Sequence, residues 1–468
     1  MGRRIGAQAE PRGRRSGRAK DADTGRARMT TVPASPWLQL RSWKLLLLSI
    51  LCAVGTWTYA DRVLIPHQIS DAAAQGRPRG NFSDLYPRWI GARELLLYGR
   101  DPYRPEVTRE IQAGYYGRPL DPSRPGDPKD QQAFAYPVYV VFYLAPALHL
   151  GFGVVQRAFF WILVGVTLAS IPLWLRVLGW RVGPLGQASM VVLTLGSMAV
   201  LQGLKLQQLS LLVAALCAAS VALLAAGRPI PAGILLALAT IKPQLVLPLV
   251  LWLGIWTIGD PRRRYRLAAS FLIVMVVLCA ASEWFLPHWI VRFWHAAGAY
   301  LQYTQAVPVL EAVVPYPWGR LLVVLLAGTV AAVCFKQRRE PENTDAFRSS
   351  ICLVMALTVL TVPTFSLYNQ ALLLPAILLI ARDRRMFWGR NQVTRALLIA
   401  VTVLSAWPWF CCTALAALSF VLSQGSVERA WAAPLWTVPQ LPLGVAVLML
   451  VHHYENRKIF AEPAGLRG

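Results

Sequence analysis

The chain is a succession of long apolar runs separated by short polar intervals. Most of the runs hold about 20 residues, which is the length that an α-helix needs to cross the hydrocarbon core of a bilayer. The pattern therefore predicts an all-α polytopic membrane protein with about eleven to thirteen transmembrane helices. The predicted segments are about 43–60, 134–150, 154–175, 186–203, 209–226, 229–259, 267–287, 318–335, 349–363, 371–381, 393–422 and 434–451.

The polar intervals divide the chain into a membrane domain and two tails. Residues 1–42 are rich in Arg, Gly and Ala and hold nothing that could form a core, so we predict a disordered basic tail. Residues 43–452 form the membrane domain and residues 453–468 a second tail. The longest polar interval, 61–133, follows the first helix and is predicted to be a large extracytoplasmic loop carrying surface helices. Both termini are then cytoplasmic, in a bacterial cytoplasmic membrane.

Composition and charge agree with a membrane protein. Of the 468 residues, 56% are hydrophobic, whereas soluble domains are typically about 45–50% apolar even with Gly counted. The net charge of +24 raises the alternative of nucleic-acid binding. Lys and Arg collect at the ends of the apolar runs, however, as the positive-inside rule for membrane topology expects. The charge therefore indicates topology, and no nucleic-acid partner is expected.

The cysteines and acids predict neither a metal site nor a cofactor. All seven Cys lie within or at the end of apolar runs, without the spacing of metal ligands, and are expected to act as small hydrophobes. The Asp-x-Asp pair, Asp21 and Asp23, lies in the N-terminal tail on the opposite side of the membrane from the predicted loop.

One stretch of the loop combines a helical pattern with a candidate acid. In Leu85–Tyr98 apolar side chains recur at steps of three and four residues, which predicts an amphipathic helix lying on the membrane surface. Asp84 directly precedes it. A carboxylate there could accept the proton of an attacking hydroxyl, or it could cap the helix. The spacing alone favours the cap, and the two roles are compatible.

The segment 134–150 leaves two topologies open, because Pro137 and Pro146 interrupt it. If it crosses the membrane fully, the turn at 205–208 lies on the inner face. If it re-enters instead, Lys205, Gln208 and Lys242 come to the outer face beside Asp84, provided that 229–259 forms two short helices meeting at Pro243. We favour re-entry, because it obeys the charge rule throughout.

A set of short motifs resembles glycosyltransferase family 87 between about Met29 and Ile380. The family comprises polytopic enzymes of the GT-C architecture, including polyprenyl-phosphate-mannose-dependent α-1,2-mannosyltransferases. The matching motifs are Asp84-x-Tyr86, the run Gly91–Tyr103, Phe134-Ala-Tyr-Pro137 with Ala145-Pro146, Gln208-Leu-Ser210, and Gly233 followed by Ile241-Lys242-Pro243.

The resemblance implies an integral-membrane hexosyltransferase with an inverting mechanism. Asp84 would be the catalytic base, and the donor would be a polyprenyl-phosphate-linked sugar, mannose in the best-known members. The acceptor would be a lipid-linked or cell-surface glycan, and membrane lipids would surround both substrates. A cation would stabilise the departing lipid phosphate. The candidates for that cation are Lys242, Lys205, Arg88 and Arg93.

Each further candidate has a structural alternative. Lys242 is bracketed by apolar residues and matches a family motif, but a snorkelling Lys near a helix end would look the same. Gln208 could bind sugar hydroxyls or form a polar contact between helices. Four aromatic residues could stack on a sugar or lipid, or form an interfacial aromatic belt. These are Tyr136, Trp289, Trp294 and Trp318.

The chain departs from the family pattern at two places. The later outer motif, Ser-Pro-x-Ser-Trp-x-His-His in the family, corresponds to residues 363–370 here, with Tyr368 and Asn369 near the positions of the His pair. In the Gly-Gln turn, Gln207 replaces the Gly and Ser210 the Asn. The donor or acceptor could therefore differ from the family's. The alternative function is a multi-pass flippase or transporter of lipid-linked sugars, although no internal repeat supports it.

Overall fold

The computed structural model describes residues 36–76, 83–121, 123–305, 307–363 and 366–461. Residues 1–35 of the predicted tail, with Asp21 and Asp23, lie outside these ranges, whereas 36–42 are helical and not, as predicted, disordered. The chain divides into two units, Met1–Arg41 and Ser42–Gly468, and the account below concerns the second. Every regular element within the described ranges is helical. The prediction of an all-α polytopic membrane protein is confirmed, while its GT-C arrangement stays a prediction.

Six helical segments are long and apolar enough to cross a membrane by length and composition. The first runs from Ser42 to Ala74 and begins within α1, which starts at Pro36, seven residues before the expected 43. A pair bent by 58°, α7 (Pro184–Leu195) and α8 (Met198–Lys205), gives a seventh if it counts as one span. The helices that form the six segments are α1 (Pro36–Tyr59) continuing through a π-helical turn (Ala60–Leu64) into α2 (Ile65–Ala74), α6 (Phe152–Val177), α12 (Pro261–Phe285), α15 (Trp318–Gln337), α19 (Gln392–Leu418), and the stretch that ends in α21 (Gln440–Ala461).

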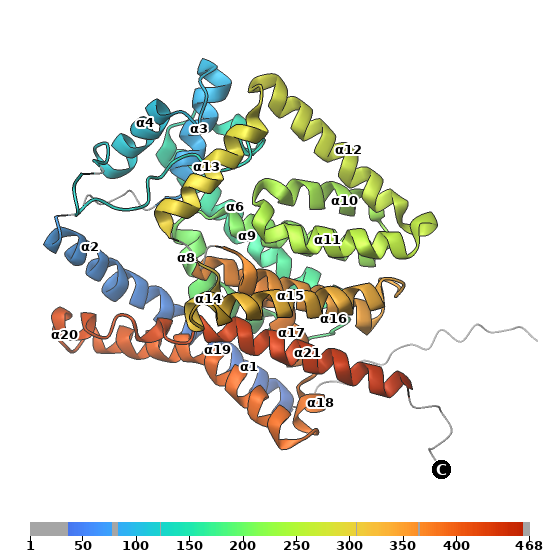
Figure 1. The fold of residues 1–468 in the computed structure, drawn as a ribbon. Helices are drawn as coiled ribbons and strands as arrows, with labels where there is room; N and C mark the ends of the chain where they lie inside the picture. Colours follow the sequence, from blue (N-terminus) through green and yellow to red (C-terminus); the bar gives the residue numbers. More distant parts are fainter. Residues whose placement is uncertain (1–35, 77–82, 122, 306, 364–365, 462–468) are drawn as a thin grey trace, which may run out of the picture. The chain divides into compact units, whose positions relative to one another are not determined.

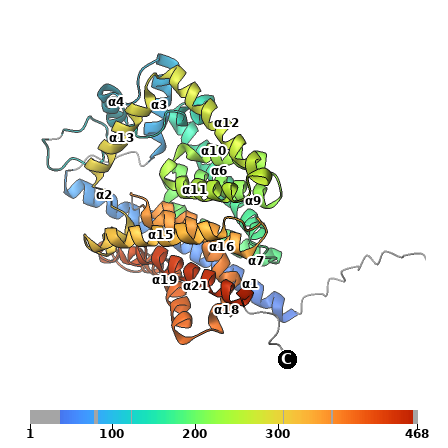
Figure 2. The same ribbon diagram turned by 45° about the vertical axis from the view of Figure 1, so that its right-hand side comes forward.

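Shorter helices follow or separate these segments along the chain. The expected eleven to thirteen crossings would require several of them to cross as well, so that number stays a prediction. In Figures 1 and 2, α10, α11 and α12 lie side by side. The shorter helices are α9 (Leu209–Ala225), α10 (Pro229–Leu238) with a 3-10 turn (Ala239–Ile241), α11 (Pro243–Gly259), α13 (Trp289–Thr304), α14 (Val309–Val313), α16 (Asp345–Thr361), α17 (Leu374–Arg382) after a 3-10 helix η4 (Leu367–Leu373), α18 (Arg384–Trp388), and α20 (Gln424–Glu428) with a 3-10 turn (Ala433–Leu435).

The chain breaks between α10 and α11 at Lys242, as predicted. Pro243 has no backbone N–H and disfavours a helical conformation at the residue before it. Lys242 accordingly has φ −126° and ψ 76°, outside the helical region. The segment 229–259 therefore forms two short helices, and the break presents the Lys242 side chain at their junction.

The first span extends to Ala74, so it takes up the start of the predicted loop 61–133; the rest of that loop carries two helices, α3 (Leu85–Tyr98) and α4 (Pro105–Tyr116). The bounds of α3 are those predicted, but its expected surface position is wrong. Leu85 and Trp89 are at most 5% exposed, and α3 packs against α5 (Val140–Leu144). The apolar face of α3 is therefore covered by protein and cannot lie on lipid.

The segment 134–150 forms no helix long enough to cross a bilayer by itself. Its only α-helix in the structure, α5, has five residues and so spans about 7.5 Å, against a hydrocarbon core of about 30 Å. The turn after α8 lies beside Asp84, whose backbone N–H donates to the carbonyl of Leu206 (3.0 Å). The re-entrant alternative predicted that this turn lies near Asp84, while the side of the membrane on which both lie stays a prediction.

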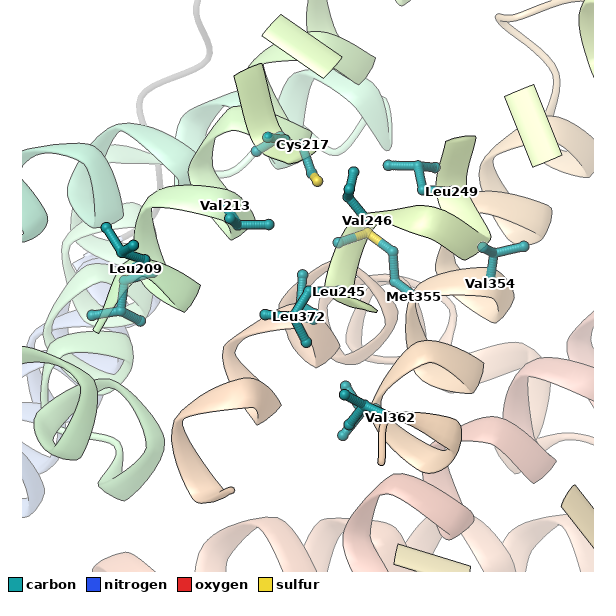
Figure 3. Close-up of a cluster of buried hydrophobic side chains, with 14 of the residues drawn as sticks. Leu209, Val213, Cys217, Leu245, Val246, Leu249, Val354, Met355, Val362 and Leu372 are labelled. Carbon is teal, nitrogen blue, oxygen red and sulfur yellow. The ribbon is translucent and has the colours of Figure 1, made fainter. Parts of the chain in front are cut away.

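A buried apolar cluster joins α9, α11, α16 and η4 (Figure 3). Leu209, Leu245 and Leu372, at most 2% exposed, belong to it. Each lies within three residues of a polar residue that the sequence singled out: Gln208, Lys242 and Asn369. Close packing of this cluster fixes the relative positions of the three polar residues.

Candidate functional site

A cavity of about 540 Å³ lies where the first loop meets the ends of α8, α10 and η4. Its floor and walls combine charged, amide and aromatic side chains with apolar residues of α11 and α13. Apart from the tryptophans, six of the side chains proposed from the sequence for catalysis or binding line it. These are Asp84, Arg88, Tyr136, Gln208, Lys242 and Asn369.

Asp84 stands at the N-cap position of α3 but does not cap the helix. Its backbone is helical (φ −69°, ψ −6°), and its side chain makes no capping hydrogen bond. One carboxylate oxygen instead accepts a hydrogen bond from the side-chain amide of Gln208. The capping alternative is therefore wrong, and the carboxylate faces the cavity.

Gln208 connects Asp84 to Lys242 through the two ends of its amide. Its Nε2 donates to Asp84, and its Oε1 accepts from the Lys242 Nζ (2.9 Å). Lys242 also donates to Ser210 Oγ (2.7 Å), which donates in turn to Asn369 Oδ1 (2.9 Å). Because the Gln208 amide lies between them, the Asp84 carboxylate and the Lys242 ammonium do not form a direct ion pair with each other.

The turn that holds Gln208 needs an unusual backbone conformation. Gln207 has φ +48°, a left-handed value that glycine adopts most easily. In this chain the Gln207 side chain stabilises the turn, since its Nε2 donates to the carbonyls of Leu204 (2.7 Å) and Lys205 (3.1 Å). Its Oε1 accepts from Ser83 Oγ (2.7 Å), which ties the residue before Asp84 to the turn.

Arg88, one helical turn after Asp84, brings a second positive charge to the cavity. One of its terminal nitrogens donates to the Tyr136 hydroxyl, and its guanidinium lies 4.2 Å from the centre of that ring. Its Nε is buried and has no hydrogen-bond partner. An anion in the cavity would supply the missing acceptor.

The surroundings of Asp84 shift its acidity in two directions. Burial raises the pKa of Asp84 above its ordinary value, although Arg88, Lys242 and the hydrogen bond from Gln208 oppose this effect. Burial disfavours the charged form of a carboxylic acid, and a raised pKa makes its carboxylate a stronger base. The site therefore holds a basic carboxylate between two cations.

Comparison with known proteins identifies the family. Residues 134–363 match the model of glycosyltransferase family 87. Over this segment the chain belongs to glycosyltransferase family 87. No curated protein matches the chain. The family and the apolar helices of the chain together identify it as a membrane glycosyltransferase.

The matched segment of the glycosyltransferase holds only part of the cavity lining. Tyr136, Gln208 and Lys242 lie within it. Asp84 and Arg88 lie before it, and Asn369 lies after it, although the resemblance in sequence motifs extended over all of them. The fold brings the three outlying residues onto the same cavity as the family segment.

The cavity of the glycosyltransferase contains an acid that sequence reasoning missed. Asp130 lines it, and burial raises the pKa of this residue. Its two carboxylate oxygens accept from the backbone N–H (2.9 Å) and the side-chain amide (3.0 Å) of Gln132, which also lines the cavity. Its place four residues before the motif that begins at Phe134 is the one signal that pointed to it.

Two proposed cations lie outside this cavity. Lys205 donates to Asp61 Oδ1 (2.7 Å) and lies over the ring of Trp57. Arg93 lies over the ring of Trp89 at 4.8 Å from its centre. Both are engaged elsewhere in the glycosyltransferase, so neither is placed to contact a substrate in the cavity.

Of the four aromatic candidates, two line the cavity and two do not. Trp294 lines the cavity together with Tyr136, and it is 75% exposed. Trp289 is buried against Tyr139, and Trp318 does not belong to the lining. Among the described residues, no group of three or more His, Cys, Asp or Glu side chains is placed to hold a metal ion.

Proposed function

We propose that this glycosyltransferase transfers a hexose, mannose in the first instance, from a polyprenyl-phosphate-linked donor to a hydroxyl of a lipid-linked or cell-surface glycan. The observation that carries the proposal is the position of Asp84. Its carboxylate is free of the helix cap, faces the cavity and is flanked by Arg88 and Lys242.

The proposed reaction inverts the anomeric carbon. The acceptor hydroxyl attacks that carbon from the face opposite the phosphate, and its proton passes to Asp84. A new carbon–oxygen bond forms as the bond to the phosphate oxygen breaks, and the electron pair leaves with the polyprenyl phosphate. Asp84 then returns its proton to solvent. A base with a raised pKa suits this step, because proton transfer is most effective when its pKa approaches the working pH.

Arg88 and Lys242 are suited to receive the phosphate. A lysine ammonium has three N–H donors, and two of those of Lys242 are used by Gln208 and Ser210. The third has no hydrogen-bond partner in the part of the chain that the structure describes. With the unpartnered Nε of Arg88, it offers donors to a leaving group whose negative charge grows in the transition state.

The distribution of charge supports a proposal for the side of the membrane on which the cavity lies. The cavity lies at the ends of the helices where Gln208, Lys242 and Asn369 are found. Basic clusters occupy the opposite ends of the same helical segments, at 262–266 after α11 and 382–385 after η4 and α17. By the positive-inside rule those clusters are cytoplasmic. We therefore propose a bacterial cytoplasmic membrane protein with an extracytoplasmic cavity and cytoplasmic termini.

The test is transfer of radiolabelled mannose from polyprenyl-phosphate-mannose to membrane acceptors by purified protein. Wild type, Asp84→Asn and a control, Asp121→Asn, are compared with and without chelator. Asp121 is a loop carboxylate outside the cavity whose side chain is 46% exposed. Loss of a general base lowers the rate by about 10²–10⁴-fold, so we expect this loss in Asp84→Asn alone.

The other outcomes are equally informative. Full activity of a folded Asp84→Asn protein would refute the catalytic role. If the wild type is inactive with this donor, other polyprenyl-phosphate sugars are tested next. If none is used, flipping of lipid-linked sugar by the protein in sealed vesicles would favour the transporter alternative. Inhibition by chelator would require a metal-dependent step in addition to Asp84.

A further inference from the structure

A second cavity, of about 370 Å³, lies at the other end of α11. Pro243, the first residue of α11, lines the reaction cavity, whereas Trp256, near the end of the helix, lines the second one. At about 1.5 Å per residue, the two positions are about 20 Å apart along the helix. The second cavity therefore belongs to the opposite face of the membrane domain.

Arginines crowd the start of α12 at this cavity. The helix begins Pro261-Arg262-Arg263-Arg264, has no acidic residue in its first turn and receives no side-chain cap from Asp260. The first N–H groups of a helix lack partners and carry partial positive charge, so basic residues in the first turn are electrostatically unfavourable. An anion bound at this point would offset both features.

Arg264 forms the wall of the cavity and is engaged by carbonyl groups. Its terminal nitrogens donate to the carbonyls of Trp256 (2.6 Å), Arg338 (2.7 Å), Arg339 (3.2 Å) and Glu340 (3.0 Å). The side chain is buried at 6% exposure, yet its Nε has no hydrogen-bond partner. The hydrogen bonds of its terminal nitrogens thus go to neutral carbonyl groups, Asp260 and Glu342 act on its charge without an ion-pair contact, and the Nε donor is left without an acceptor.

The two preceding arginines are available to a ligand. Arg262 and Arg263 are exposed and line the cavity. Within the described ranges, neither forms an ion pair. The described residues that line the cavity include four arginines and one acid, Glu342, so the lining carries a net positive charge.

We propose that this second cavity binds the phosphate of an anionic phospholipid headgroup. Its walls include apolar side chains as well as arginines. Along α12 the exposed surface continues as an apolar stripe that includes Leu272, Ile273 and Val276, each at least 58% exposed. The cavity therefore lies where a lipid-facing helix meets the interface, at the level of the headgroups. Basic pockets between membrane helices on the cytoplasmic side are suited to anionic headgroups.

The test measures binding of phosphatidylglycerol to purified full-length protein in neutral detergent by native mass spectrometry, with phosphatidylcholine as the neutral comparison. The cavity variant is Arg262→Gln/Arg263→Gln. The matched control is Arg384→Gln/Arg385→Gln, which removes the same charge from the first turn of α18. Each basic residue near a lipid surface contributes about 1 kcal/mol, so the cavity variant should weaken phosphatidylglycerol binding roughly 10- to 30-fold.

We expect the control to change this affinity less than threefold, and Arg262→Lys/Arg263→Lys to keep most of it. The lysine variant separates loss of charge from loss of folding. Equal affinity in the cavity variant and the wild type would overturn the proposal, and so would an equal loss in the control. Competition by inorganic phosphate alone, with no preference for phosphatidylglycerol, would overturn the assignment to a lipid. The proposal is independent of the transferase reaction, because binding is measured without donor or acceptor.

Discussion

Replacing Lys242 by Met removes a buried charge while keeping the length of the side chain. Lys242 is 5% exposed. Its ammonium donates to Gln208 and Ser210 and lies 4.9 Å from the centre of the Tyr368 ring. No carboxylate contacts it in the described part of the chain. The substitution therefore tests whether the charge serves catalysis or is a snorkelling lysine that serves only the fold.

The structure predicts a small effect on stability and a large one on turnover. Two hydrogen bonds from a charged donor are lost, each contributing about 1.5–3 kcal/mol. Against this, the desolvation of one buried charge, which costs several kcal/mol, is relieved. The free energy of unfolding should therefore change by no more than about 2 kcal/mol. Loss of a preorganised donor to developing negative charge lowers kcat by about 10²–10³-fold.

The assay measures kcat and KM for transfer from polyprenyl-phosphate-mannose in nanodiscs, together with the thermal unfolding midpoint. The matched control is Lys205→Met, the same change at a lysine that is paired with Asp61 outside the cavity. We expect kcat to fall far more than KM rises in Lys242→Met, and the control to stay within threefold of wild type. A folded Lys242→Met protein with kcat within threefold of wild type would refute the reasoning and favour the snorkelling alternative.

Three further predictions follow from individual contacts. Burial raises the pKa of Asp84 above the ordinary value of 3.8. Because a base acts when deprotonated, kcat/KM should rise with pH through a limb that lies above this ordinary value. A profile that stays flat down to pH 4 would contradict this. Gly91→Ala would bring a methyl group to 2.3 Å from the buried ring of Phe134. Such overpacking costs about 1–3 kcal/mol of folding free energy, so the thermal unfolding midpoint should fall. An unchanged midpoint would show that the ring moves freely. The hydrogen bond from Arg118 lowers the pKa of Asp127 to about 2. The pair therefore stabilises the loop fully at pH values above the unfolded pKa near 3.8, and this stabilisation is lost as pH falls towards 2. Proteolysis of residues 118–127 should accelerate between pH 4 and pH 2 and not between pH 7 and pH 5.

Local rules predicted the features that depend on nearby residues. The helix Leu85–Tyr98 follows from apolar spacing, and the break at Lys242 follows from the proline after it. The charge rule favoured re-entry of 134–150, and the five-residue helix α5 is too short for a full crossing, while re-entry itself stays a prediction. Asp84, Gln208, Lys242 and Asn369 could be proposed together because a family resemblance connected motifs far apart in the sequence, and their meeting depends on tertiary packing.

Features that depend on distant partners could not be predicted. Lys205 and Lys242 both lie between apolar runs, and only the fold shows that Asp61 pairs with Lys205. Asp130 lies in a loop without helical periodicity, so nothing local placed it on the cavity. The apolar face of α3 has the same pattern whether lipid or protein covers it, because both exclude water equally well.

The attachment of Ser83 and Asp84 to the turn at Leu206–Gln208 constrains how the enzyme matures during synthesis. These contacts join residues 124 positions apart, and the contact between Ser210 and Asn369 spans a further 159. At about 5–20 residues per second, the ribosome needs roughly 6–25 seconds to reach the turn after it has made Asp84. During that time the carboxylate has neither Gln208 nor Lys242 beside it. A nascent chain that stops before Asn369 therefore lacks a complete site, so activity arises only after most of the membrane helices have been inserted.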